Sequence, residues 1–113
     1  MIMNRQNAQH YNWGTHCDGW VLLPRSDLMI IEERMPPGAA EIRHFHRVAR
    51  QFFYVLSGTL HMELEGETQA VPAGGSMEIP PLQRHQARND SREDVRFLVV
   101  SSPTTRGDRV DCE

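Results

Sequence analysis

The sequence contains no lysine, since all twelve of its basic residues are arginine. This absence excludes enzymes that form a Schiff base through a lysine amine. The only two cysteines, Cys17 and Cys112, lie near opposite ends of the chain and do not resemble a disulfide framework, so we expect free thiols. The net charge of −3 argues against a nucleic-acid-binding protein, which would need a basic face.

Long apolar runs and a leader-like start are also missing. No apolar stretch approaches the ~18–20 residues that cross a membrane as a helix. The first residues, MIMNRQNAQHYNWG, lack a basic flank followed by an apolar stretch, so no signal peptide is expected. We therefore predict a cytoplasmic protein with neither membrane nor nucleic acid among its partners.

The 113 residues are enough for one domain, and an apolar share of 39% is typical of a soluble globular protein. Helical periodicity is hard to find, whereas short strand-like runs alternate with turn residues. Strands are predicted at 20–23, 27–35, 41–46, 51–57, 59–64, 67–71, 76–79, 85–89 and 95–101. Tight links at Gly58 and at Glu65-Gly66 indicate consecutive antiparallel hairpins. The pattern predicts an all-β sandwich, jelly roll or small barrel.

Three imidazoles and one amide form a candidate metal site. His44 and His46 stand two apart, so in a strand they share a face and could hold one ion. Gln51 begins the next strand, on a face whose other residues are apolar. Because unpaired polar groups are costly to bury, a metal would explain this convergence. His85 is the fourth candidate. A His-x-His pair alone is weak evidence for a metal site, since histidines in strands also occur at the surface or hydrogen-bonded to the backbone.

Two longer patterns surround these residues. The first reads Gly38-AAEIR-His44-F-His46-RVAR-Gln51-FFYVLS-Gly58, and the second reads Gly74-GSMEI-Pro80-P-Leu82-QR-His85-QAR-Asn89. Together they resemble the two motifs of the cupin family, with two departures: Gln51 stands for Glu and Leu82 for Gly. Leucine tolerates positive φ poorly, so the turn at Leu82 either adopts another conformation or carries strain.

The resemblance implies a single-domain, small antiparallel jelly-roll β-barrel, often dimeric, with one divalent metal inside. The positions that match its ligands are His44, His46, Gln51 and His85. We predict an N-terminal extension or barrel cap at 1–19, the barrel at 20–102 and a C-terminal tail at 103–113. Both polar termini are expected to be less ordered or to pack on a partner subunit.

A glutamine ligand would leave the charge of a divalent ion uncompensated. We therefore expect lower metal affinity than with a carboxylate, more acidic bound water, and a preference for anionic ligands. Nitrogen-rich ligation favours a transition metal, with Zn, Fe, Ni, Mn, Co and Cu all open. The alternative is that Gln51 only hydrogen-bonds a neighbouring ligand or a water molecule.

Other residues have two interpretations each. Glu78 would be a general base if it pointed inward and a solvated charge if it pointed outward. His61 is expected at the surface or in the cavity wall, and Trp13 or Trp20 could close the pocket. Phe52 and Tyr54 have the parity opposite to Gln51 and are expected to pack beneath the barrel. No further acid–base pair is visible.

Two functions remain. The first is a metal-dependent enzyme acting on a small organic substrate, anionic or enolisable, as a dioxygenase, isomerase or cyclase. The alternative is a non-catalytic cupin module that binds a small molecule or a metal. A homodimer is the expected assembly.

Overall fold

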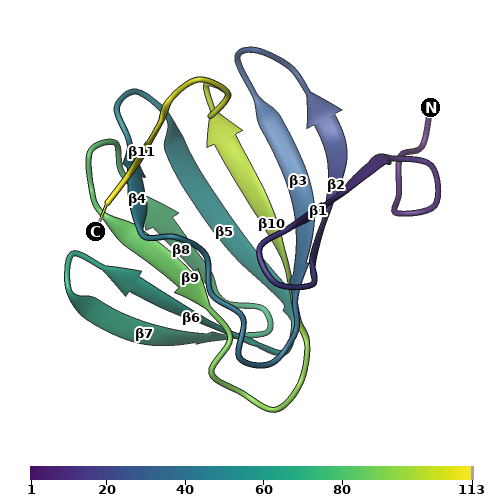
Figure 1. Ribbon diagram of the computed structural model, residues 1–113. Coiled ribbons are helices and arrows are strands. Elements are labelled where there is room, and N and C mark those ends of the chain that lie inside the picture. The colour runs from purple at the N-terminus through teal and green to yellow at the C-terminus, as the bar shows by residue number, and fades with distance from the viewer. Residues whose placement is uncertain (113) are drawn as a thin grey trace.

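Two antiparallel sheets enclose the core of the chain. Residues 1–112, which the computed structural model describes, form eleven strands and no helix. The strands are β1 (Gln9–Trp13), β2 (Cys17–Pro24), β3 (Met29–Met35), β4 (His44–His46), β5 (Arg50–Ser57), β6 (Thr59–Leu64), β7 (Glu67–Pro72), β8 (Ser76–Ile79), β9 (His85–Arg88), β10 (Val95–Ser102) and β11 (Arg109–Asp111). One sheet has the order β1-β2-β3-β10-β5-β8 and the other β11-β4-β9-β6-β7 (Figure 1). This confirms the predicted all-β fold.

Strict alternation along β5 and β10 positions the core. Phe53 and Val55 point inward and pair with Val99 and Phe97 of β10, and all four side chains are buried. Burial of side chains of this size contributes about 1.5–3 kcal/mol each. The same alternation turns the next inward position, Gln51, toward the interior. The strand therefore leads from an apolar core to a polar site.

The outer face of β5 differs from the prediction. Phe52 and Tyr54 do not pack beneath the barrel but remain 42% and 39% exposed on its outside. Both side chains do lie on the face opposite to Gln51, as predicted, but in the single chain no element of the described residues covers this face of the sheet.

Both thiols, Cys17 and Cys112, are free, as predicted.

The two glycine links have different roles. Glu65-Gly66 joins β6 to β7 in an antiparallel hairpin, which confirms the prediction. The hairpin predicted at Gly58 is wrong, because β5 and β6 lie in different sheets. Gly58 has φ of 77°, and a Cβ there would lie 2.3 Å from the carbonyl oxygen of Asp94. A glycine is thus required where the chain crosses from one sheet to the other.

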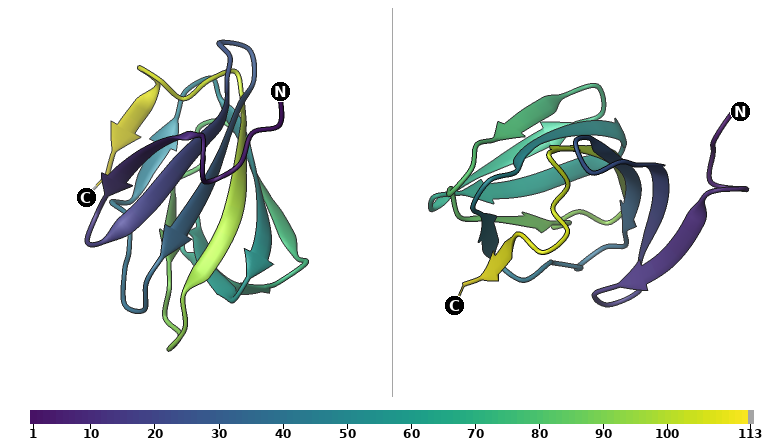
Figure 2. Two further views of the ribbon diagram at one scale, coloured as in Figure 1. Left: turned by 90° about the vertical axis from the view of Figure 1, so that its right-hand side faces the viewer. Right: turned by 90° about the horizontal axis from the view of Figure 1, so that it is seen from above.

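Both termini form strands that the sequence analysis did not predict. β1 pairs with β2 at the edge of the six-stranded sheet, and β11 pairs with β4 at the edge of the five-stranded sheet (Figure 2). Part of each polar terminal segment therefore belongs to a sheet, and both β1 and β11 contribute residues that line an interior cavity. In residues 1–112 there is no helix of the length and apolarity that crossing a membrane would require.

Candidate metal centre

Three imidazoles from two neighbouring strands meet in the interior. β4 brings His44 and His46 to one face, and its pairing with β9 sets His85 directly opposite His44. The ring centroids of His44 and His85 lie 4.4 Å apart, and those of His44 and His46 lie 4.9 Å apart. One nitrogen from each ring fits within a group whose members all lie within 4.8 Å of one another. The predicted convergence of the three histidines is confirmed.

Backbone carbonyls orient two of these rings. Nδ1 of His44 lies 2.7 Å from the carbonyl oxygen of Ile42, and Nδ1 of His85 lies 3.0 Å from that of Gln83. A carbonyl oxygen only accepts, so each Nδ1 carries the hydrogen and donates it. The lone pair then resides on Nε2, which is the usual arrangement of a metal-binding histidine.

Gln51 reaches the same place from the other sheet. Its Nε2 donates to Oγ of Ser101, the residue paired with it on β10, at 3.2 Å. This bond fixes the amide so that Oε1 is the free end. Oε1 of Gln51 and Nε2 of His85 are both buried without a hydrogen-bond partner among the described residues. Two unpartnered buried acceptors are costly, and a cation would satisfy both. The donor set therefore fits a transition metal, while ligation by Gln51 itself stays a prediction.

Burial keeps the imidazoles uncharged. It lowers the pKa of His44 to about 3 and that of His46 to about 4, and it also lowers the pKa of His85. The mutual proximity of the three rings acts in the same direction. Neutral imidazole is the form that ligates metals, so the site is ready for a cation at neutral pH.

Asp108 holds the turn that separates two of the candidate ligands. The carboxylate of Asp108 accepts hydrogen bonds from the backbone N–H groups of Arg47, Val48 and Ala49, in the turn between His46 and Gln51. Burial alone would raise the pKa of Asp108, but these three donors hold it below its usual range.

The turn before β9 keeps the left-handed conformation despite its leucine. Leu82 has φ of 73°, and its N–H donates to the carbonyl oxygen of His46 at 2.7 Å. Of the two alternatives, the turn therefore carries strain, at a cost of about 1–2 kcal/mol. The position of His85 is preserved.

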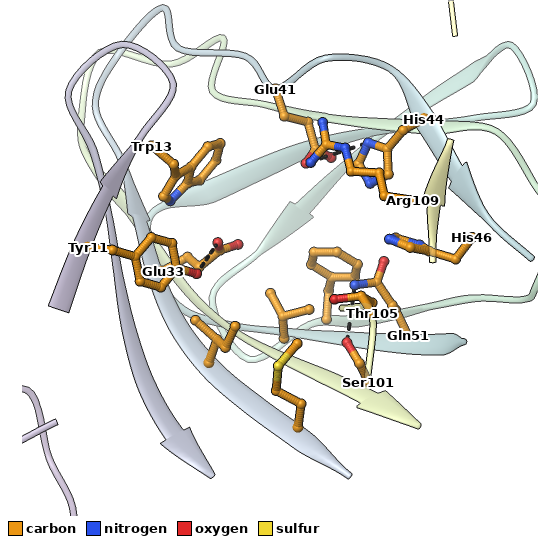
Figure 3. Close-up of a pocket in the computed structure, with 14 residues that line it drawn as sticks. Tyr11, Trp13, Glu33, Glu41, His44, His46, Gln51, Ser101, Thr105 and Arg109 are labelled. Atoms are coloured by element: carbon orange, nitrogen blue, oxygen red, sulfur yellow. Dashed lines mark hydrogen bonds and ion pairs between the residues drawn. The ribbon is translucent and has the colours of Figure 1, made fainter. Parts of the chain in front are cut away.

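His44 and His46 form part of the wall of a cavity of about 210 Å³, together with Gln51 (Figure 3). The sequence analysis missed several residues that line it: Tyr11, Glu33, Glu41, Ser101, Thr105 and Arg109. A signal existed for Glu33, because it shares strand parity with Met29 and Met35, which are buried. No such signal marked Thr105 or Arg109, which lie in the segment predicted to be a tail.

Two carboxyl groups in the cavity have raised pKa values. Burial, reinforced by the charge of Glu41, raises the pKa of Glu33 to about 8. Burial raises that of Glu41 to about 7, against the hydrogen bond from the Ala87 N–H. Oε1 of Glu41 lies 3.9 Å from Nδ1 of His44. The cavity thus contains the acid–base groups that were not visible in the sequence.

For each of the other candidate residues, the structure shows which of the two predicted positions the side chain occupies. Glu78 points outward and pairs with Arg50 at 2.6 Å, so it is a solvated charge. Nδ1 of His61 accepts from the Asp90 N–H, outside the cluster. Trp13 lines the cavity, whereas Trp20 stacks with His10 away from it.

Comparison with known proteins agrees with this geometry. Residues 31–101 match the family model described as Cupin domain, which is more than half of the chain. The polyketide synthase CurC of Streptomyces cyaneus is 36% identical over 69 residues, which cover 61% of this chain and 45% of CurC. The chain spans about half the length of the curated relatives it matches. It belongs to the cupin family.

Solved structures support the same fold. An RmlC-like cupin from Shewanella frigidimarina superimposes with a TM-score of 0.84 at 23% identity, covering 94% of this chain and 93% of that one. The polyketide cyclase RemF from Streptomyces resistomycificus gives 0.81 at 21% identity, covering 92% and 80%. At these identities the likeness concerns the fold alone, so the chemistry has to be argued from the cavity.

Proposed function

We propose that the protein is a metal-dependent enzyme that acts on a small, enolisable organic substrate, as a cyclase or isomerase does. The observation that carries the proposal is the convergence of three neutral imidazoles, two of which line a cavity together with Gln51, whose buried Oε1 has no hydrogen-bond partner among the described residues. When bound there, a divalent transition metal would supply Lewis-acid polarisation of a substrate oxygen.

The residues of the cavity support this class of substrate. Phe53 and Val99 supply an apolar wall, and Trp13 supplies an aromatic one. Arg109 brings a cation to the same space and would favour a substrate that is anionic or becomes so. A volume of about 210 Å³ lies below the usual range of drug-sized ligand pockets, which suits a small organic molecule.

The relatives are consistent with such chemistry. CurC is described as a polyketide synthase, and RemF as a polyketide cyclase. Cyclisation of a polyketone needs an enol or enolate as its nucleophile, so an enolisable substrate would be common to these chemistries. The homodimer expected from the family resemblance stays a prediction.

Metal titration tests the site. Untagged wild-type protein, stripped of metal, is titrated with Zn²⁺, Ni²⁺, Co²⁺ and Mn²⁺ by calorimetry, beside the variants His85→Ala and His61→Ala. Wild type and His61→Ala should bind one ion per chain with equal affinity, because His61 lies outside the cluster. His85→Ala should lose at least about 100-fold in affinity. Equal binding by all three proteins would contradict the proposed site.

Turnover then separates an enzyme from a binding module. The metal-loaded protein is incubated with 1,3-dicarbonyl compounds and sugar phosphates, with product analysis and oxygen uptake followed in parallel. Isomerised or cyclised product without oxygen consumption is expected. Metal binding without conversion of any substrate class would favour the non-catalytic module.

A further inference from the structure

Glu33 lies in the cavity wall across from the histidine cluster. It occupies the middle of β3, with its side chain directed into the same space as His46 and Gln51 (Figure 3). The hydroxyl of Tyr11, from β1, donates to its Oε2 at 3.4 Å. The residue keeps partial contact with solvent, but protein atoms surround the carboxyl group. Solvent and ligands therefore reach it through the cavity.

Glu33 lacks the arginine partner that two other largely buried carboxylates, Glu32 and Glu63, have. Glu32 pairs with Arg96 at 3.0 Å, and Glu63 pairs with Arg43 at 2.6 Å. Among residues 1–112, Glu33 makes no ion pair, and its one side-chain hydrogen bond, from Tyr11, is long. A carboxylate left unpaired inside a protein costs several kcal/mol, so a purely structural role would have favoured an apolar residue.

The surroundings of Glu33 favour a group that exchanges protons. The titratable and charged groups that face it are Tyr11 of β1, Cys17 of β2, Glu41 before β4 and Arg109 of β11. Burial and the charge of Glu41 outweigh Arg109 and the Tyr11 hydrogen bond, which is why the pKa lies at about 8. A carboxyl group with a pKa near ambient pH serves as base and then as acid in one cycle.

We propose that Glu33 is the catalytic proton-transfer residue of the cavity, acting on an enolisable carbonyl compound held between it and the histidine cluster. This inference rests on the proposed function. In the step, the Glu33 carboxylate takes the proton from the carbon next to the carbonyl group. The C–H bond breaks, an O–H bond forms, and the electron pair moves into a C=C bond while the carbonyl oxygen becomes anionic. Return of the proton to another atom of the substrate gives a tautomer without any oxidant.

Tyr11 is a positioning residue in this account. Its hydroxyl binds Oε2 of Glu33, which leaves Oε1 for the substrate. The hydrogen bond also stabilises the carboxylate and lowers the pKa of Glu33 relative to burial alone. A phenylalanine at position 11 should therefore raise that pKa further, an effect that a purely steric role would not produce.

The first test needs no turnover. Protein labelled with ¹³C at the glutamate carboxyl groups is titrated by NMR in the metal-free state, and the Glu33 signal is assigned by its loss in Glu33→Gln. A midpoint near pH 8, shifted upward in Tyr11→Phe, is expected. A midpoint near the ordinary value of 4.5 would overturn the proposal whether or not the protein binds metal.

The second test uses 2,4-pentanedione as the probe. Deuterium incorporation at its central carbon is followed by NMR for metal-loaded wild type, Glu33→Gln and the control Glu78→Gln, whose carboxyl lies on the outer face. Wild type and Glu78→Gln should exchange equally, with a rate that rises through pH 8, and Glu33→Gln should fall at least about 100-fold toward the buffer rate. Equal exchange by Glu33→Gln, or none by wild type, would overturn the inference. Metal titration of the same three proteins shows separately whether the metal site stands.

Discussion

Replacing Asp108 by alanine should loosen the metal site, although Asp108 lies about 60 residues after the turn that it holds. Asp108 accepts three backbone N–H groups at 2.8–3.0 Å, all from the turn between His46 and Gln51. The N–H groups of Arg47 and Val48 are exposed, so water replaces the lost acceptor there. Ala49 is 1% exposed, and its N–H would lose a charged acceptor without full compensation.

The magnitude follows from these contacts. A buried donor left without its partner costs about 1–3 kcal/mol, and the two exposed bonds add a fraction of that. We expect Asp108→Ala to lower the free energy of unfolding by about 2–3 kcal/mol. For a chain of 113 residues this corresponds to a fall in melting temperature of about 10 °C. Because the turn joins His46 to Gln51, metal affinity should also fall about tenfold or more.

Thermal unfolding by circular dichroism and metal titration by calorimetry measure both effects. The matched control is Asp111→Ala, which removes a carboxylate from β11, the strand that follows Asp108. The partner of Asp111 is the exposed Arg109 side chain. The control should melt close to wild type, since exposed ion pairs contribute little. If Asp108→Ala behaved like Asp111→Ala in both assays, Asp108 would not hold the turn, and the reasoning would be refuted.

Three further predictions concern single residues. Leu82→Gly should relieve the left-handed strain at a largely exposed side chain and raise stability by about 1 kcal/mol, or about 4 °C in melting temperature; an unchanged value would argue against strain. Gln51→Glu should raise metal affinity roughly tenfold or more in calorimetry, and equal or weaker binding would argue against Gln51 as a ligand. In the metal-free protein, folded Glu33 keeps its proton up to pH 8 while the unfolded chain releases it near 4.5, so stability falls as pH rises through this window by up to about 1.4 kcal/mol per unit. Urea unfolding at pH 5 and pH 8 should show that Glu33→Gln removes part of this loss, and an identical loss in the variant would contradict it.

The candidate site was largely predictable because its signal is local. The spacing of His44, His46 and Gln51 places them on inward faces through strand alternation alone, and the family resemblance adds His85. The rest of the cavity depends in part on long-range pairing. β1 and β11 are short and polar; β11 is stabilised by β4, far back in the chain, whereas β1 forms a hairpin with the next strand, β2.

Two errors have specific physical causes. The link at Gly58 has the sequence of a tight turn, but whether such a turn joins paired strands or crosses between sheets depends on the approach of Asp94, far along the chain. Glu33 was assigned only to a strand, although its parity with Met35 placed it inside. Alternation predicted its direction, whereas the lack of an ionic partner could be found only from the folded structure.

X-ray absorption spectroscopy of the protein loaded with Zn²⁺ tests the central claim most directly. The account predicts one ion per chain with three imidazole nitrogens at about 2.0–2.1 Å, and a shell that loses one of them in His85→Ala. Failure to bind one ion per chain, or a shell without three imidazoles that is unchanged in His85→Ala, would contradict it.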